Sequence, residues 1–127
     1  MKYKIRVVRG AFIDSSILDN FDAKTIEKLN ENDWKSIDEI IVNLKQIRKL
    51  QKQMVKHYNN VRVPWYLDGY NLENNDDYIV AFGGDDGNGG KIFEFSLKDK
   101  IAINEVISYG ISKGIPKEQL DWMNIKF

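Results

Sequence analysis

The chain has 127 residues, 43% of them apolar and 30% charged, and these values are typical of one globular domain rather than of a disordered chain. It has no cysteine, which excludes disulfides and zinc–thiolate sites, and its 19 basic and 19 acidic residues cancel, which argues against a domain that binds polyanions with its whole surface. No secretory signal pattern is found, and no apolar stretch approaches the ~20 residues needed to span a bilayer. We therefore predict a single soluble domain, residues 1–127, located in the cytoplasm.

The N-terminal part predicts a strand followed by a helix. Residues 3–7 alternate apolar and basic side chains, and period-two alternation is typical of a strand with one buried face. Asp22 is a favourable N-cap residue and follows an aromatic residue that can pack on the first turn. This arrangement predicts a helix over residues 23–29.

The longest periodic segment predicts a long helix. Ser36 and Glu39 have the spacing of a capping box. Apolar residues then recur at intervals of three and four, which is typical of one face of a helix. The pattern predicts a helix over residues 37–58, about 33 Å long at ~1.5 Å per residue.

The middle of the chain predicts irregular structure. Pro64 cannot donate a hydrogen bond to a neighbouring strand, so we interpret residues 61–67 as an edge segment or a loop. The pair Asp68–Gly69 indicates a turn. Residues 71–77 are mostly polar and predict a loop.

Two strand candidates follow, at residues 78–82 and 91–95. Between them lies the segment GGDDGNGG, residues 83–90. Strands joined by such a segment predict an antiparallel hairpin with a long glycine-rich loop. If the second strand is regular, Ile92 and Glu94 share one of its faces.

The C-terminal part predicts a further helix. Ser96 or Asp99 is its N-cap, and Gly114 with the proline two residues on marks its end. Residues 116–122 predict a short helical turn and residues 123–127 a last strand. The element order predicts an α+β fold: a mostly antiparallel sheet containing a central β-hairpin, with a long helix and one or two shorter helices packed on one face.

Opposite charges are segregated into neighbouring blocks. Residues 40–62 contain six basic residues and no acidic one, and residues 63–90 contain six acidic residues and no basic one. Because the whole chain is neutral, this segregation predicts two distinct charged surfaces.

The acidic block predicts a surface that docks on a basic protein, because complementary charge speeds association. Aromatic residues beside the acids are typical of interface contacts. The predicted protein-binding residues are Tyr66, Asp68, Tyr70, Asp76, Asp77, Asp85 and Asp86. A small inhibitor or immunity protein that neutralises a basic nuclease toxin would present carboxylates in this way. The alternatives are a solvated loop and a calcium site, although the aspartates lack the ligand spacing of an EF-hand.

The basic block predicts a second surface. Lys45, Lys49, Lys52 and Lys56 follow a four-three-four spacing, which places them on one face of the predicted helix. Contact with phosphates of a nucleic acid is the functional alternative. The alternative without a function is a helix face that only contacts solvent.

No sequence pattern predicts catalysis, a metal site or a cofactor. His57 is the only histidine, and no motif supplies it with an orienting partner or a nucleophile. The glycine-rich segment has Asp85 and Ile92 at positions where a phosphate-binding loop requires glycine and a hydroxyl residue.

The sequence therefore predicts a protein-binding module without catalytic activity, whose partner is a basic protein and which has no membrane partner. A nucleic-acid-associated protein and a hydrolase with an unrecognised site are the alternatives. The pattern predicts no particular oligomeric state.

Overall fold

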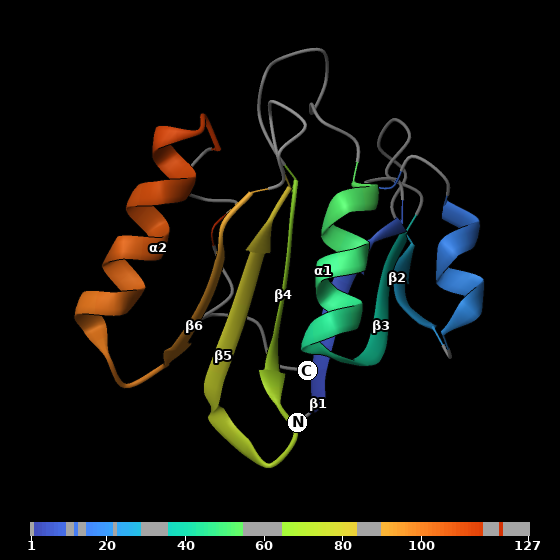
Figure 1. Ribbon diagram of the computed structural model, residues 1–127, viewed down its shortest axis with the longest axis horizontal. Coiled ribbons are helices and arrows are strands. Elements are labelled where there is room, and N and C mark those ends of the chain that lie inside the picture. Colours follow the sequence, from blue (N-terminus) through green and yellow to red (C-terminus); the bar gives the residue numbers. More distant parts are fainter. Residues whose placement is uncertain are drawn as a thin grey trace.

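A six-stranded sheet forms the centre of the structure (Figure 1), a computed structural model that describes residues 2–9, 12, 15–21, 23–28, 36–54, 65–83, 90–115 and 120. Its elements in chain order are β1 (Lys2–Val8), the short 3-10 helix η2 (Ser15–Asn20), β2 (Lys24–Lys28), β3 (Ser36–Asn43), α1 (Leu44–Gln53), β4 (Tyr66–Asn71), β5 (Asn74–Phe82), β6 (Ile92–Ser96) and α2 (Lys100–Ser112).

The strands are ordered β2-β3-β1-β4-β5-β6, and every neighbouring pair is antiparallel. β3 and β4 both run antiparallel to β1, so they are parallel to each other. The connection from β3 to β4 contains α1, which packs across one face of the sheet (Figure 1). β1 is therefore an internal strand, paired on both sides.

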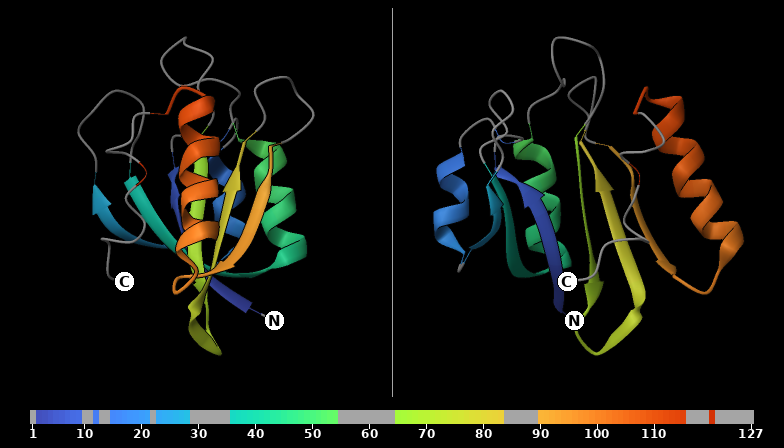
Figure 2. Two further views of the ribbon diagram at one scale, coloured as in Figure 1. Left: turned by 90° about the vertical axis from the view of Figure 1, so that its left-hand side faces the viewer. Right: turned by 180° about the vertical axis from the view of Figure 1, so that it is seen from behind.

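The two α-helices cover opposite faces of the sheet. On β5, Ile79 and Ala81 belong to the core that contains α1, whereas Val80 and Phe82 belong to the core that contains α2. Successive side chains of a strand point to opposite faces. We call these faces the α1 face and the α2 face. In Figure 2, the view from behind shows β1 passing in front of α1.

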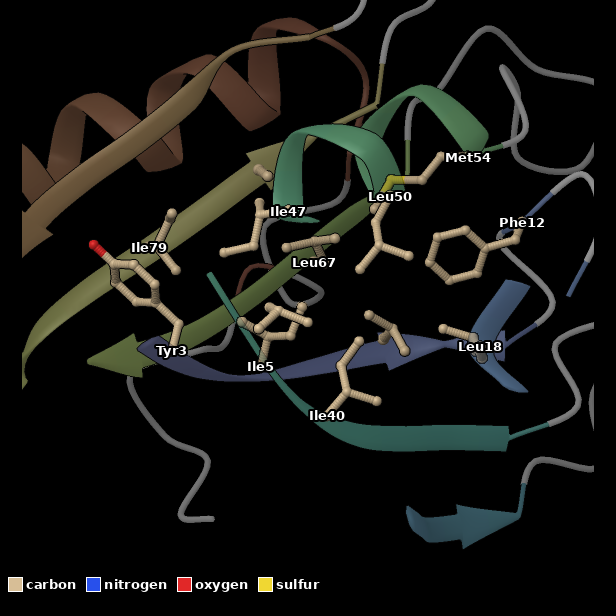
Figure 3. Packing of buried hydrophobic residues seen from close by; sticks show 13 residues of the cluster. Tyr3, Ile5, Phe12, Leu18, Ile40, Ile47, Leu50, Met54, Leu67 and Ile79 are labelled. Carbon is tan, nitrogen blue, oxygen red and sulfur yellow. The ribbon is translucent and has the colours of Figure 1, made fainter. Parts of the chain in front are cut away.

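The α1 face holds the larger core (Figure 3). Ile47 and Leu50 of α1 are fully buried against the sheet. Each such side chain contributes about 1.5–3 kcal/mol of hydrophobic stabilisation. The buried residues of this core are Tyr3, Ile5, Val7, Phe12, Leu18, Ile40, Val42, Ile47, Leu50, Met54, Leu67, Ile79 and Ala81.

Aromatic rings fill the α2 face. The ring centroid of Phe82 lies 4.8 Å from that of Tyr109 on α2 and 6.0 Å from that of Phe93 on β6. The helix begins as predicted at Asp99, whose Oδ1 accepts a hydrogen bond from the Ala102 amide at 3.1 Å. Gly114 follows the helix with a φ of 92°, a conformation that favours glycine.

Several predictions for the fold are confirmed. The structure is α+β, with an antiparallel sheet, a strand over residues 3–7, and a hairpin between residues 78–82 and 91–95. The prediction that both helices pack on one face is wrong, because β5 has buried apolar side chains on both of its faces and each face requires its own cover. Residues 116–119 and 121–127 lie outside the described residues.

Of the two helices predicted in the first half of the chain, the first is absent from the described residues and the second is confirmed only in part. The segment predicted as a helix at 23–29 contains strand β2, which pairs with β3. The predicted helix at 37–58 is strand β3 followed by α1, and residues 55–58 lie outside the described part. The capping box is formed by Asn43 and Gln46: each side chain bonds the other's backbone amide.

The structure of residues 66–77 also differs from the predicted edge segment, turn and loop. β4 is an internal strand, between β1 and β5, and Asp68–Gly69 lies within it. A Cβ at Gly69 would lie 2.1 Å from the carbonyl oxygen of Lys4, so this glycine permits close approach of two strands rather than a turn. The chain reverses at Leu72 and Glu73, where the Asn71 side chain accepts a bond from the Glu73 amide.

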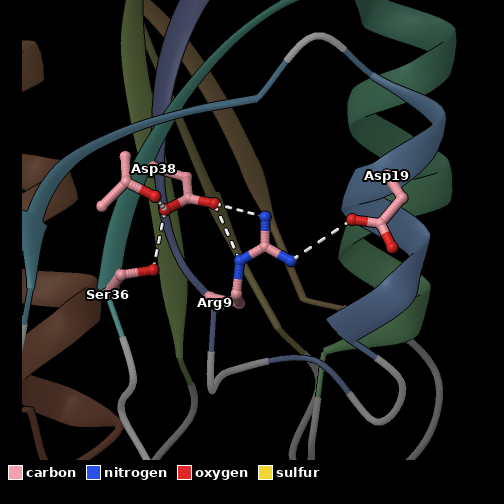
Figure 4. A network of polar contacts seen from close by, with 5 residues as sticks. Arg9, Asp19, Ser36 and Asp38 are labelled. Carbon is pink, nitrogen blue, oxygen red and sulfur yellow. Dashed lines mark hydrogen bonds and ion pairs between the residues drawn. The ribbon is translucent and has the colours of Figure 1, made fainter.

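A buried carboxylate ties β2, β3 and the end of β1 together (Figure 4). Asp38 on β3 is completely buried and accepts hydrogen bonds from Ser36 and Thr25, at 2.7 and 3.0 Å. Arg9 Nη2 lies 2.6 Å from Asp38 Oδ2, and the same guanidinium reaches the exposed Asp19 at 3.6 Å. Burial alone would raise the pKa of Asp38, but the hydrogen bonds from Ser36, Arg9 and Thr25 outweigh it and lower the pKa below its ordinary value.

This network predicts a pH-dependent stability. The pKa of Asp38 is lower in the folded protein than in the unfolded chain, where it is about 4. The ionised network therefore stabilises the fold fully above about pH 4, and this stabilisation is lost as the pH falls through the pKa of the folded protein. We expect Asp38→Asn to lower the free energy of unfolding by about 2 kcal/mol at pH 7, and the difference from wild type to narrow below about pH 4. Urea unfolding at several pH values measures this. Glu105→Gln, which removes an exposed carboxylate outside this network, is the matched control. An effect of Asp38→Asn that does not change with pH would contradict the assignment.

A glutamine of α1 holds the base of the glycine-rich segment. The buried Gln51 donates from Nε2 to the carbonyl oxygens of Phe82 and Gly90, at 2.7 Å each. A Cβ at Gly90 would lie 2.2 Å from the Phe82 carbonyl oxygen, so the two chain segments meet closely at this point. Gln51 therefore joins the end of α1 to both ends of the hairpin loop.

We expect Gln51→Ala to reduce the free energy of unfolding by about 1–3 kcal/mol, because the buried Phe82 carbonyl and the partly buried Gly90 carbonyl lose their donor. Gln53→Ala, on the exposed side of the same helix, is the matched control and should be nearly neutral. Urea unfolding compares the two variants. Equal stability of both would show that Gln51 does not hold the loop base.

Candidate protein-binding surfaces

Four carboxylates lie in the turn between β4 and β5 and on strands β5 and β6, and one of them, Asp76, alternates with Asp77 and lies on the α2 face. Glu94 lies opposite Ile79 in the β5–β6 ladder, and Asp77 is two residues before Ile79, so Asp77 and Glu94 are diagonal neighbours on the α1 face. Both are exposed. We call the following set the acidic surface: Glu73, Asp76, Asp77 and Glu94.

A buried tyrosine fixes one member of this surface. Tyr3 donates from its hydroxyl to Glu94 Oε1 at 2.8 Å. Burial, with the hydrogen bond to Glu94 and the charges of Glu94 and Asp77, raises the pKa of Tyr3 to about 12. Tyr3 therefore remains a neutral donor at physiological pH, and it orients Glu94 without cancelling its charge.

Asp76 differs from the other members because it has a cation beside it. Lys98 Nζ lies 3.2 Å from Asp76 Oδ2, and the Lys98 side chain is largely exposed while that of Asp76 is half-exposed. Exposed ion pairs of this kind contribute little to stability and are easily exchanged for other partners. The pair with Lys98 is therefore weak.

Asp68 was predicted as a contact residue, but it is buried inside the sheet. It lies opposite Arg6 in the β1–β4 ladder, and Arg6 Nη2 is 2.6 Å from Asp68 Oδ2. Tyr78 also donates to Asp68 Oδ2, at 2.5 Å, and burial together with the Asp68 charge raises the pKa of Tyr78. Asp68 is only 4% exposed, so it stabilises the sheet and cannot meet a partner directly.

The other predicted contact residues do not lie together. Tyr66 and Tyr70 are half-buried on the α2 face, where the Tyr66 ring lies 5.7 Å from that of Phe82. Asp85 and Asp86 lie outside the described residues. Their loop leaves β5 at Gly83, six residues beyond Asp77 along an extended strand, which is about 20 Å at ~3.3 Å per residue. The carboxylates around Asp77 and this loop are therefore attached at opposite ends of β5.

The predicted basic residues lie on the outer side of α1. The exposed cations of this helix, called the basic helix face below, are Lys45, Arg48, Lys49 and Lys52. Within the described part of the chain, none of the three lysines forms an ion pair with an acidic side chain. Lys56 and His57 lie outside the described residues.

Sequence reasoning missed Glu94. The alternation along residues 91–95 indicated that Glu94 shares a face with Ile92, but not which residue of the preceding strand lies beside it. That neighbour depends on the register of the β5–β6 pair, which a glycine-rich loop of this length leaves open.

Two further observations concern ligands and membranes. Among the described residues, no three side chains of histidine, aspartate or glutamate converge as ligands of a metal ion. No helix in the same part of the chain has both the length and the apolar content needed to cross a bilayer.

Comparisons with known proteins were made at three levels. No protein-family model, no curated protein and no solved structure matches this chain.

Proposed function

We propose that this chain is a protein-binding module that docks the acidic surface on a basic region of a partner protein. The observation that carries the proposal is the pair of exposed carboxylates Asp77 and Glu94, which are neighbours on one face of the sheet. Like charges side by side repel each other in the free protein. A cationic partner relieves this repulsion, which favours the bound state.

The position of these carboxylates supports docking in a second way. Both lie on strands rather than on a loop, and Tyr3 holds the Glu94 carboxylate. Side chains held before binding lose less conformational entropy when a partner arrives. Their field also attracts a cationic surface and raises the association rate.

The more specific form of the proposal is an inhibitor or immunity protein for a basic nuclease. A nuclease has cations where it holds the phosphates of its substrate. Carboxylates at fixed positions on a small domain can occupy the same cations and exclude the nucleic acid. The aspartates of the glycine-rich loop, Asp85 and Asp86, belong to this form of the proposal.

The acidic surface predicts the behaviour of the double variant Asp76→Asn/Asp77→Asn. The immobilised wild-type chain should retain a basic protein from an extract of its native cells at low salt and release it at high salt. The double variant should bind the same purified protein with an association rate at least about tenfold lower, because it has lost two of four charges. Surface plasmon resonance at several salt concentrations measures this.

The matched control is Asp19→Asn, which removes an exposed carboxylate on η2. Circular dichroism establishes that all variants are folded. The proposal fails if the double variant binds the partner as fast as the control does, or if the retained partner has an acidic surface and its binding does not depend on salt.

The second candidate is a nucleic-acid-associated protein that uses the basic helix face. It is supported by four exposed cations on a ten-residue helix, with no acidic residue in its first turn. Cations along one helix face can contact successive phosphates, which releases counterions and makes binding depend steeply on salt.

If this candidate is correct, the wild-type chain should retard duplex DNA or single-stranded RNA in a gel at low salt. The triple variant Lys45→Gln/Lys49→Gln/Lys52→Gln should then abolish the shift and lower the slope of log affinity against log salt by about three. A triple variant of lysines elsewhere, Lys91→Gln/Lys98→Gln/Lys113→Gln, is the control. No shift by the wild-type chain at low salt excludes this candidate.

A further inference from the structure

β6 is the last strand of the sheet, and no described segment pairs with its outer side. The Phe82 amide donates to the Lys91 carbonyl at 2.9 Å, and the Leu97 amide donates to the Asp76 carbonyl at 2.7 Å. In an antiparallel pair, alternate residues direct their amide and carbonyl groups toward the partner strand. The backbone groups of Ile92, Glu94 and Ser96 are therefore directed away from β5, although the Ser96 carbonyl already accepts a hydrogen bond from the Asp99 amide at 2.9 Å.

A groove runs beside this edge, between β6 and α2. It has a volume of about 630 Å³. Two of its apolar side chains are Phe93 of β6 and Ile101 of α2, and Ile101 is 75% exposed. The residues that line the groove are Lys91, Phe93, Ile101, Asn104, Glu105, Ser108, Tyr109 and Ser112.

The two ends of the groove differ in chemistry. At the end where β6 begins, Lys91 Nζ lies 5.8 Å from the centroid of the Phe93 ring and 5.6 Å from that of Tyr109. At the other end, where the chain turns from β6 into α2, Ile101 exposes its side chain. One end therefore attracts a carboxylate, and the other favours an apolar residue.

We propose that an extended segment of a partner protein pairs antiparallel with β6 and places alternate side chains in this groove. Strand addition to a sheet edge derives affinity from backbone hydrogen bonds and specificity from alternate side chains. An antiparallel segment runs from the Ile101 end to the Lys91 end, about 13 Å or four residues at ~3.3 Å each. The recognised pattern is an apolar residue followed four positions later by an acidic residue, with a small polar residue between them.

A second copy of this chain is a poorer occupant of the same edge. Antiparallel pairing of β6 with itself about Glu94 would place the two Glu94 carboxylates directly opposite each other, beside Asp77 of each copy. Like charges in this position destabilise strand pairing. The charge pattern of β6 therefore favours a different chain.

This inference does not depend on the acidic surface. Asp77 and the Glu94 carboxylate lie on the α1 face, whereas the groove lies on the α2 face. Asp76 also lies on the α2 face but does not line the groove. The edge uses only the backbone of Glu94. Loss of binding at one surface therefore leaves binding at the other to be measured separately.

The test uses a fluorescent seven-residue peptide with valine, serine and glutamate at positions two, four and six and threonine elsewhere. Fluorescence anisotropy should show binding to the wild-type chain below ~1 mM. Lys91→Glu should weaken binding at least about tenfold, and a peptide with lysine in place of glutamate should bind Lys91→Glu better than it binds wild type. Lys52→Glu, on α1, is the control and should change neither affinity.

Backbone pairing is tested with N-methylated peptides and with hydrogen exchange. Methylation of the amides that face β6 should abolish binding, and methylation of the alternate amides should not. The bound peptide should slow exchange at the amides of Ile92, Glu94 and Ser96. The proposal is overturned by absence of binding at ~1 mM, by equal effects of both methylation patterns, or by the same amide protection arising from dimerisation of the chain alone.

Discussion

The central residues of strands β1, β4 and β5 are buried on both faces of the sheet, and this constraint explains where the polar groups lie. A strand with no solvent face cannot carry a lone charge, because an unpaired buried charge is strongly destabilising. Arg6 and Asp68 meet this condition by lying opposite each other on neighbouring strands, with Tyr78 as a second donor to the carboxylate. Asp68 is therefore a structural residue, buried together with its sequence neighbours Leu67 and Gly69.

The same constraint leaves only the periphery of the sheet for contact with other molecules. The acidic surface lies at the β4–β5 turn and on β6, and the basic helix face lies on the outer side of α1. The proposed peptide groove follows the outer edge of β6. A small domain with these separate surfaces can bind one partner through charge and another through its backbone, which is consistent with the proposed role in protein binding.

The sequence was sufficient where only one periodicity fits the residues. The strand at residues 3–7 shows a clear period of two, the glycine-rich segment separates the two hairpin strands, and Asp99 and Gly114 bound a helix with specific cap chemistry. The sequence was insufficient over residues 36–43, because their apolar side chains fit both helical and strand spacing. These residues form a strand because they pair with β1. Asp68 and Glu94 show the same limit for the site, because strand neighbours determine which carboxylate is buried and which is exposed.

The central claim is that α1 and α2 cover opposite faces of one sheet and so confine binding to its turns, edges and outer helix surfaces. Nuclear Overhauser contacts from the two sides of β5 test it most directly. The account predicts contacts from the methyl groups of Ile79 to side chains of α1 such as Ile47, and contacts from the ring of Phe82 to Tyr109 of α2. Contacts from Ile79 and Phe82 to the same helix would contradict it.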